Sequence, residues 1–404
     1  MPNRSIVLLA SLFAASLNLL ADSKPQPLPP MTAEKWRADV DYFARELPKR
    51  HKNAFHAITR EQFAAEVAAL GAKAEKANDD EMIVGLMRIA AMVGDGHTYV
   101  HLSSSTRQFP VSITNIENHY RVVRGAGAAA ELVGGKLTRI DGTSLDDALA
   151  KIRTILPQDE SEELLTGFTP QWLSIAEVLH GLGISKSAET ARFTVTMDDG
   201  SERSADVASI AVTAKPEWRT ATANPPLYRQ RLGEPFWFTW IPESGTVYVN
   251  WRKYDDMRGK SRELWAFVDS HPTQRIAIDL RQNGGGDFNV GRKYMVDEVA
   301  KRPKIRAYVI TSARTFSAAL KNAIDFREVA HATLVGETIG ERPNSYSEND
   351  EMRLPQSQLQ VSYSTMFYKF RPDDGLIKPD KEIRPTWAEW VAGQDPVLDW
   401  IVKQ

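Results

Sequence analysis

The carboxyl-terminal half of the chain alternates short apolar segments with longer amphipathic ones. The short segments are GTVYVN (245–250), RIAIDL (275–280), RAYVIT (306–311) and ATLVGE (332–337). Short apolar runs without polar alternation are typical of strands that are buried on both faces, as in parallel sheets. Each run is separated from the next by enough residues for a crossover helix. The alternation therefore predicts an α/β core over residues 230–404.

Residues 31–105, which come before this core, have a helical pattern. In the first segment, apolar residues recur at the spacing of a core-facing helix: Trp36, Val40, Phe43 and Leu47. Two more helices are predicted, one opening on Thr59 as its cap and one on Asp79 or Asp80. A helical region that ends in the segment carrying His97 is therefore expected.

Residues 106–215 have a different pattern, with β-branched runs and tight turns. ARFTVTMDDGSERSADV (191–207) predicts a β-hairpin that turns at Asp199-Gly200. Residues 157–183 interrupt this pattern with a helical insertion. A separate β-rich domain is therefore predicted between the helical region and the core.

The first thirty residues have the features of an export signal. Arg4 precedes a mostly apolar stretch from Ile6 to Leu20, which is short for a membrane span. Residues 1–21 are therefore predicted to be a signal peptide, with an uncleaved anchor as the alternative. Residues 22–30 are predicted to be an extended linker. The mature protein is expected to be periplasmic or secreted, without a membrane span.

Composition excludes several functional classes. The chain of 404 residues contains no cysteine, so disulfides, thiolate metal sites and a cysteine nucleophile are ruled out. Its formal net charge of −2 provides no field for nucleic acid. No metal site is expected from His97 and His101, because a strand between them would separate the two residues by about 13 Å. No cofactor is implied, and the oligomeric state cannot be read from the sequence.

Three consecutive glycines, Gly284–Gly286, follow the apolar run 275–280. Glycine lets the backbone approach a ligand closely and leaves N–H groups available. The spacing of these glycines fits neither G-x-x-x-x-G-K-[ST] nor G-x-G-x-x-G, the two glycine-rich motifs that bind phosphate groups. This mismatch favours an oxyanion site over a phosphate site. A sharp structural turn is the alternative.

Small hydroxyl residues gather where the strand 306–311 meets a helical pattern. Ser317 stands at the start of that helix, where the helix dipole favours a developing alkoxide. Most serines at such positions are helix caps, and Thr315 is the predicted cap here. Lys321 follows one helical turn later, but a solvated helix lysine is expected there rather than the base of a Ser–Lys pair.

His97 is distinct among the eight histidines because VGDGHTYVHL flanks it with Gly94, Asp95 and Gly96. Such a turn joins a helix to a strand and can present an imidazole at the mouth of a site. Histidine is the usual general base near neutral pH. A satisfied structural histidine is the alternative, since pairing with a serine in space cannot be read from sequence order.

Taken in order, these motifs resemble the C-terminal-processing (tail-specific) serine peptidase family. IDLRQNGGG, VITSARTFSAAL, ATLVGETIGERPNSY and DDGLIKPDKEI each resemble one segment of that family. VGDGHT resembles the histidine segment of the tricorn-core branch and of retinoid-binding-protein relatives. The resemblance implies an α/β (α+β multidomain) protein with a helical bundle, a degenerate PDZ-like domain at 106–215 and a ClpP/crotonase-like core.

When the family's site residues are carried over to the matching positions of this sequence, the resemblance implies that Ser317 is the nucleophile and His97 the general base. The N–H groups of Gly284 or Gly285, together with that of Ala318, take the positions of the oxyanion hole. No role in metal binding is implied for any residue.

Two departures from the family pattern concern the base and its partners. The tail-specific branch has a catalytic lysine where this chain has Glu341, and the tricorn-like branch has a serine where this chain has Gly96. A family acidic residue falls near Asp373. Either Glu341 or Asp373 is expected to orient His97 or the substrate amine, with a solvated loop acid as the alternative for both.

The leading expectation is an exported serine peptidase that cleaves polypeptide substrates by acyl transfer. A non-catalytic ligand-binding protein on the same scaffold is one alternative. An esterase or amidase for small substrates is the other, because the same serine–histidine chemistry would serve it.

Overall fold

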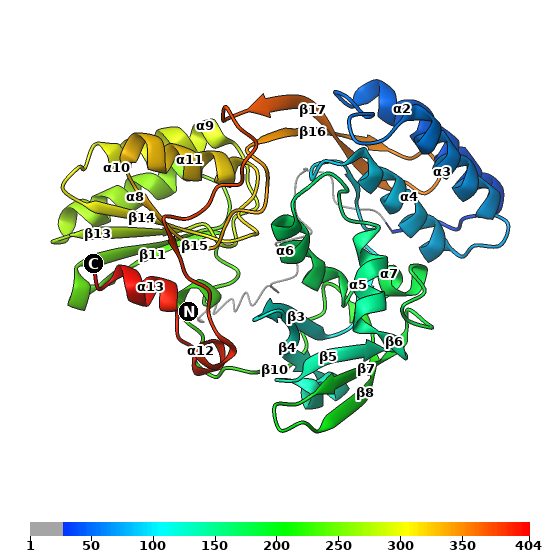
Figure 1. Ribbon diagram of the computed structural model, residues 1–404, viewed down its shortest axis with the longest axis horizontal. Coiled ribbons are helices and arrows are strands. Elements are labelled where there is room, and N and C mark those ends of the chain that lie inside the picture. Colours follow the sequence, from blue (N-terminus) through cyan, green and yellow to red (C-terminus); the bar gives the residue numbers. More distant parts are fainter. Residues whose placement is uncertain (1–26) are drawn as a thin grey trace, which may run out of the picture. The chain divides into compact units, whose positions relative to one another are not determined.

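The computed structural model describes residues 27–404, which divide into two compact units (Figure 1). The core unit contains residues 222–341 and 376–404, and the N-terminal unit contains residues 27–221 and 342–375. The predicted signal peptide (1–21) and most of the predicted linker (22–30) lie outside the described residues. None of the helices within 27–404 combines the length and the apolar content needed to cross a membrane.

The core unit is built on a six-stranded sheet with the order β11-β12-β13-β14-β15-β18. β11 pairs antiparallel with β12, and every other neighbouring pair is parallel. All residues of β12 and β13 are buried, as their apolar sequences predict. The bounds are β11 Phe236–Ile241, β12 Thr246–Trp251, β13 Arg275–Asp279, β14 Arg306–Thr311, β15 Thr333–Gly336 and β18 Lys381–Glu382.

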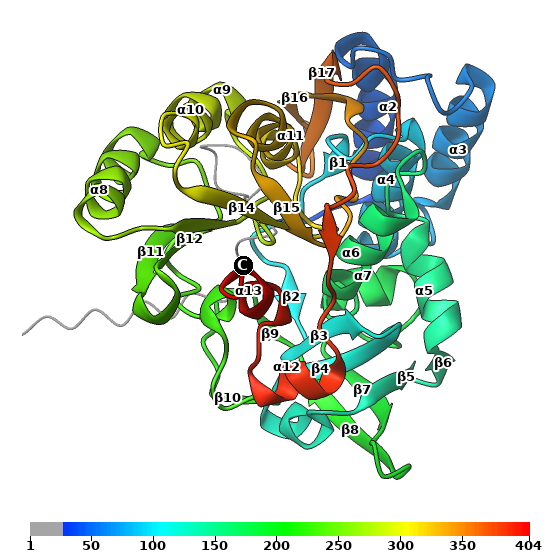
Figure 2. The same ribbon diagram turned by 60° about the vertical axis from the view of Figure 1, so that its left-hand side comes forward.

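Helices cover both faces of this sheet. α8, α9, α10 and α11 connect successive parallel strands and lie on one face, and α13 lies on the other (Figures 1 and 2). On the α13 face, Val397, Leu398 and Ile401 share one hydrophobic cluster with Tyr248 and Ile310. The bounds are α8 Met257–Ser270, α9 Phe288–Gly291, a π-helical turn Arg292–Val296, α10 Asp297–Ala300, α11 Ala318–Ala330, α12 Trp387–Ala392 and α13 Pro396–Ile401.

The N-terminal unit begins with three helices, α2 (Ala33–Arg50), α3 (Arg60–Lys73) and α4 (Asp79–Val93). The four apolar residues predicted to face the core in α2 are at most 2% exposed. Thr59 caps α3 as predicted. The cap predicted for α4 was wrong: Asn78 caps it, because its side chain and that of Glu81 bond each other's backbone N–H groups in a capping box.

A seven-stranded antiparallel sheet follows, with the helical insertion packed beside it (Figure 2). The predicted hairpin is present, since β7 and β8 pair antiparallel from Thr190↔Ala208 to Thr196↔Glu202. The strand bounds are β3 Val111–Ile116, β4 His119–Ala126, β5 Lys136–Ile140, β6 Thr143–Ser144, β7 Thr190–Thr196, β8 Glu202–Ala208 and β10 Trp218–Thr220. The helix bounds are α5 Leu145–Arg153, α6 Glu162–Trp172 and α7 Ala176–Gly181, and a small ribbon pairs β2 Arg107–Gln108 with β9 Ile210–Ala211.

A long ribbon from late in the chain completes the N-terminal unit. β16 (Asn344–Arg353) and β17 (Gln360–Lys369) pair antiparallel, and β17 also pairs with β1 (Tyr99–Val100). The residues just after His97 are thereby joined to a segment about 260 positions further along the chain. The domain boundaries expected from the sequence stay predictions.

Candidate active site

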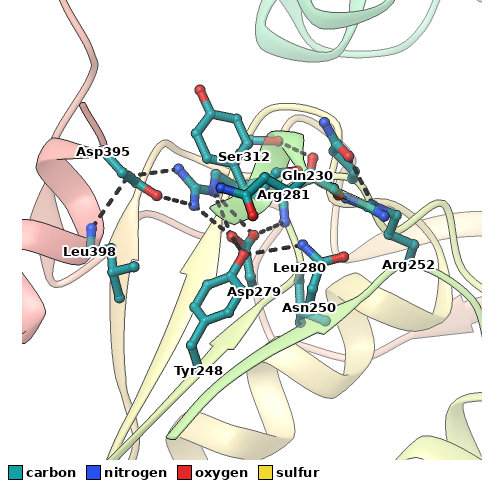
Figure 3. Close-up of polar contacts among 12 residues, drawn as sticks. Gln230, Tyr248, Asn250, Arg252, Asp279, Leu280, Arg281, Ser312, Asp395 and Leu398 are labelled. Atoms are coloured by element: carbon teal, nitrogen blue, oxygen red, sulfur yellow. Dashed lines mark hydrogen bonds and ion pairs between the residues drawn. The ribbon is translucent and has the colours of Figure 1, made fainter. Parts of the chain in front are cut away.

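The carboxyl end of β13 in the core unit is fixed by a buried ionic network (Figure 3). Arg281 forms ion pairs of 2.5 Å with Asp279 and 2.7 Å with Asp395, and its side chain is 11% exposed. Burial lowers the pKa of Arg281, but the two carboxylates outweigh burial and raise that pKa above its usual value. Asp395 also caps α13 through the N–H of Leu398. The exit of β13 is therefore tied to the carboxyl-terminal helix.

Hydroxyl groups connect this exit to the turn between β14 and α11. Ser312 Oγ donates to the carbonyl of Arg281 at 2.8 Å, and Thr315 Oγ1 donates to the carbonyl of Leu280 at 2.9 Å. The prediction that Thr315 caps the helix is wrong, since the N-cap position belongs to Ser317. Thr315 is fully buried and stabilises the turn instead.

Ser317 has an unusual conformation at the start of α11. Its φ of 56° and ψ of −123° place it in a region that residues other than glycine rarely adopt, at a cost of about 1–3 kcal/mol. Its side chain makes no capping hydrogen bond, although it occupies the position where serine usually caps. A strained serine between a strand and a helix is also found at the nucleophile turn of other hydrolases. The hydroxyl cluster therefore supports a turn whose last serine does not act as a helix cap.

Gly285 lies directly against Ser317. A Cβ atom added to Gly285 would lie 2.6 Å from Ser317 Cβ and 3.1 Å from Ser317 Oγ. The φ of Gly285 is +105°, which residues with side chains rarely adopt. Glycine is therefore required here both by backbone conformation and by the close approach of the serine.

The predicted oxyanion donors differ in their hydrogen bonding. The Gly285 N–H donates to Asn283 Oδ1 at 2.9 Å, so it is already engaged. Within the described residues, the N–H groups of Gly284 and Ala318 make no hydrogen bond. Ala318 is the first residue of α11, where orphan N–H groups and the helix dipole favour an anion.

Glu341 is buried beside the same turn. Its side chain is brought there by the loop after β15, and its Oε2 accepts the backbone N–H of Ser317. Glu341 is 2% exposed, which differs from the solvated loop acid considered as its alternative. Lys321 instead forms an ion pair with Asp325 one turn further along α11.

His97 lies in the N-terminal unit, in the turn between α4 and β1, and is 3% exposed. Gly94 ends α4 with a φ of 113°, and the His97 N–H donates to Asp95 Oδ1 at 3.1 Å. Asp95 also accepts hydrogen bonds from His51 Nε2 at 2.9 Å and from Ser364 Oγ at 2.7 Å. Burial raises the pKa of Asp95, but these partners outweigh burial, so that pKa is lowered and the group is a carboxylate.

The imidazole of His97 faces β16. Its Nε2 lies 3.3 Å from Ser347 Oγ. Burial lowers the pKa of His97, while the charges of Asp95 and Glu348 act in the opposite direction. Because the net pKa is below the usual 6.5, the ring is neutral at neutral pH, the form that a general base requires.

Asp373, the other acid expected at the site, has an exposed side chain. Its carboxylate accepts the Gly375 N–H at 3.0 Å and pairs with Arg371 at 3.7 Å, and its side chain is 63% exposed. These contacts are those of a solvated loop acid. The sequence arguments missed Asp95, His51 and Glu348, although Asp95 stands only two positions before His97. No group of acidic and histidine side chains within 27–404 has the arrangement of a metal site.

Comparisons with known proteins identify the fold. No family model matches the sequence, and no curated protein matches it. The crystal structure of mature CPAF is similar, with a TM-score of 0.62 at 11% identity, over 92% of this chain and 97% of that one. The structure of mature CPAF complexed with lactacystin has a TM-score of 0.63 at 11% identity, and the match covers 92% of this chain and 98% of that one. The match to the photosystem II D1 C-terminal processing protease covers 90% of this chain and 98% of that one at 13% identity, with a TM-score of 0.42.

The two CPAF structures belong to serine peptidase family 41, the family whose motifs the sequence resembles. The similarity to mature CPAF extends over nearly the whole of both chains. The predicted fold class, a mixed α/β multidomain protein with the fold of this family, is therefore confirmed.

Proposed function

We propose that the protein is an exported serine peptidase that hydrolyses peptide bonds in polypeptide substrates. The observation that carries the proposal is the conformation of Ser317. Its strained backbone positions the serine at a helix N-terminus and against Gly285, and its hydroxyl does not cap the helix. Strain of this kind is found where function requires it.

In the proposed reaction, His97 accepts the proton of Ser317 as the serine oxygen attacks the substrate carbonyl. The backbone N–H of Ala318 and one from the glycine loop 284–286 donate to the oxyanion, an effect of about 10²–10³-fold in rate per donor. His97, now protonated, then donates its proton to the leaving amine, and water hydrolyses the acyl-enzyme with His97 again as base.

Residues of the N-terminal unit are proposed to serve this chemistry in two ways. Asp95 fixes the backbone of His97, and its charge, together with the smaller effect of Glu348, stabilises the imidazolium form. The seven-stranded sheet is proposed to act as a PDZ-like domain that holds an extended substrate peptide. Export is proposed from residues 1–21 and is tested by following the protein into the periplasm or medium.

The test is labelling of the purified protein by a fluorophosphonate probe, which reacts with activated serines. Ser317→Ala and His97→Ala are compared with Ser270→Ala, which removes an exposed hydroxyl at the end of α8. Labelling of the wild type and of Ser270→Ala, lost in the other two variants, is expected. A folded wild type that does not react would refute the proposal and favour a ligand-binding protein. Labelling together with hydrolysis of p-nitrophenyl acetate but not of casein would favour an esterase.

A further inference from the structure

Asn283 joins three segments of the core unit through one buried residue. Its side chain is fully buried. Asn283 Nδ2 donates to the carbonyl of Trp251 at 3.0 Å, and Asn283 Oδ1 accepts the Gly285 N–H at 2.9 Å. The Phe316 N–H donates to the Asn283 carbonyl at 3.0 Å. The end of β12, the glycine loop and the turn before Ser317 therefore meet at this residue.

The two side-chain bonds determine which N–H groups of the loop are available. Because Asn283 engages Gly285, that N–H is not presented to a ligand. The N–H groups of Gly284 and Gly286 make no hydrogen bond within the described residues. A loop held in this way presents backbone donors beside Ser317 without any further movement, which is the condition for strong oxyanion stabilisation.

The far end of the loop is also held. A Cβ atom on Gly286 would lie 2.6 Å from the ring of Tyr254, so the ring packs directly on the backbone. Tyr254 is itself fixed by a hydrogen bond of 2.7 Å from its hydroxyl to Asn322 Oδ1. The loop is thus anchored at both ends, while the stretch facing Ser317 carries no side chain.

We propose that Asn283 is a positioning residue, which sets the distance between the glycine loop and Ser317 without touching the substrate. This inference rests on the proposed function, since it assigns the oxyanion donors of that reaction. It assigns the loop donor to Gly284 or Gly286 and excludes the Gly285 N–H.

The experiment compares Asn283→Ala with Asn250→Ala in reaction with the fluorophosphonate probe. Asn250 is a suitable control because it is a buried amide at the end of β12, 2% exposed, bonded to the Tyr248 hydroxyl and not to the loop. Both the maximum rate constant of inactivation and the probe concentration at half-maximum are measured, along with the unfolding midpoint. A positioning role predicts that Asn283→Ala lowers the rate constant at least 100-fold and changes the half-saturating concentration less than threefold. Asn250→Ala is expected to retain the wild-type rate constant within threefold.

Asn283→Asp and Asn250→Asp provide a second comparison if the alanine variant does not fold. Aspartate keeps the acceptor for the Gly285 N–H but removes the donor to Trp251, so Asn283→Asp is expected to lose less activity than Asn283→Ala where both can be measured. Where only the aspartate pair folds, Asn283→Asp is expected to react at least tenfold more slowly than Asn250→Asp. Equal rate constants within either pair would refute the inference. A wild type that does not label refutes the proposed function itself, so the two failures are distinguishable.

Discussion

Replacing Gly285 by alanine tests whether the loop approaches a reacting serine. The new Cβ atom would lie 2.6 Å from Ser317 Cβ, whereas nonbonded carbon atoms prefer about 3.5–4.0 Å. The loop or the serine must therefore move by about 1 Å. A misplacement of about 1 Å in a reacting group can cost about 100-fold in rate. We expect Gly285→Ala to label with the fluorophosphonate probe about 100-fold more slowly than the wild type.

The backbone conformation adds a separate cost, which a second glycine isolates. Gly285 has a φ of +105°, and an alanine in left-handed backbone conformations costs about 1–2 kcal/mol. Gly200, in the hairpin turn of β7 and β8, has a φ of +82°, and its Cβ atom would meet nothing within 4 Å. Gly200→Ala is therefore expected to lose about 1–2 kcal/mol of unfolding free energy without any change in labelling.

The assay measures the labelling rate and the free energy of unfolding of both variants in urea. The contact with Ser317 predicts that only Gly285→Ala loses reactivity with the probe. Its loss of unfolding free energy is expected to be equal to or greater than that of Gly200→Ala. If Gly285→Ala labels within threefold of the wild-type rate, the argument that the glycine loop and Ser317 form one site is refuted.

Four further predictions concern strain, charge and pH. Ser317→Gly is expected to raise the free energy of unfolding by about 1 kcal/mol and to abolish labelling, because glycine relieves the positive φ; urea unfolding checks this against Ser317→Ala. Arg281→Ala, which leaves two buried carboxylates unpaired, is expected to lose about 3–5 kcal/mol. The control Arg192→Ala breaks an exposed pair and is expected to lose at most about 1 kcal/mol. Burial raises the pKa of Glu160 to about 8, so the folded state holds a proton that the unfolded state releases above about pH 4.5. Stability should therefore fall between pH 4.5 and 8 by up to about 1.4 kcal/mol per pH unit, and Glu160→Gln should remove that slope. Because burial lowers the pKa of His97, the labelling rate should fall as the pH decreases with a midpoint below the 6.5 of an ordinary histidine, as a rate profile will show.

The sequence predicted the core because buried parallel strands carry their own signal. β12 to β15 lie at the four apolar runs of the sequence. A strand that is covered on both faces consists almost entirely of apolar residues, so it can be recognised from the sequence. The caps of α3 and α4 show where local reasoning succeeds and where it fails. Both are capping boxes, but cap preference does not separate Asn78 from the two aspartates that follow it, and only the bond with Glu81 identifies the cap of α4.

The partners of the site residues could not be predicted, because they are distant in sequence. His51 stands 44 positions before Asp95, and Ser364 stands 269 positions after it. The contact of His97 with Ser347 spans 250 positions and depends on a ribbon that returns to the N-terminal unit late in the chain. Periodicity describes which face of an element is buried, but it does not identify the element that covers that face.

The position of Glu341 bears on the proposal that the base is a histidine and not a lysine. The Glu341 side chain accepts the Ser317 N–H and so stabilises the strained turn at the start of α11. An ionised carboxylate at this position would disfavour a serine alkoxide formed in advance, because like charges repel strongly in a partly buried site. The proton must therefore leave as the serine attacks, and it must go to a neutral base. In the proposed reaction the neutral, buried imidazole of His97 takes this role, whereas a lysine at the position of Glu341 would require the turn to be held by other groups.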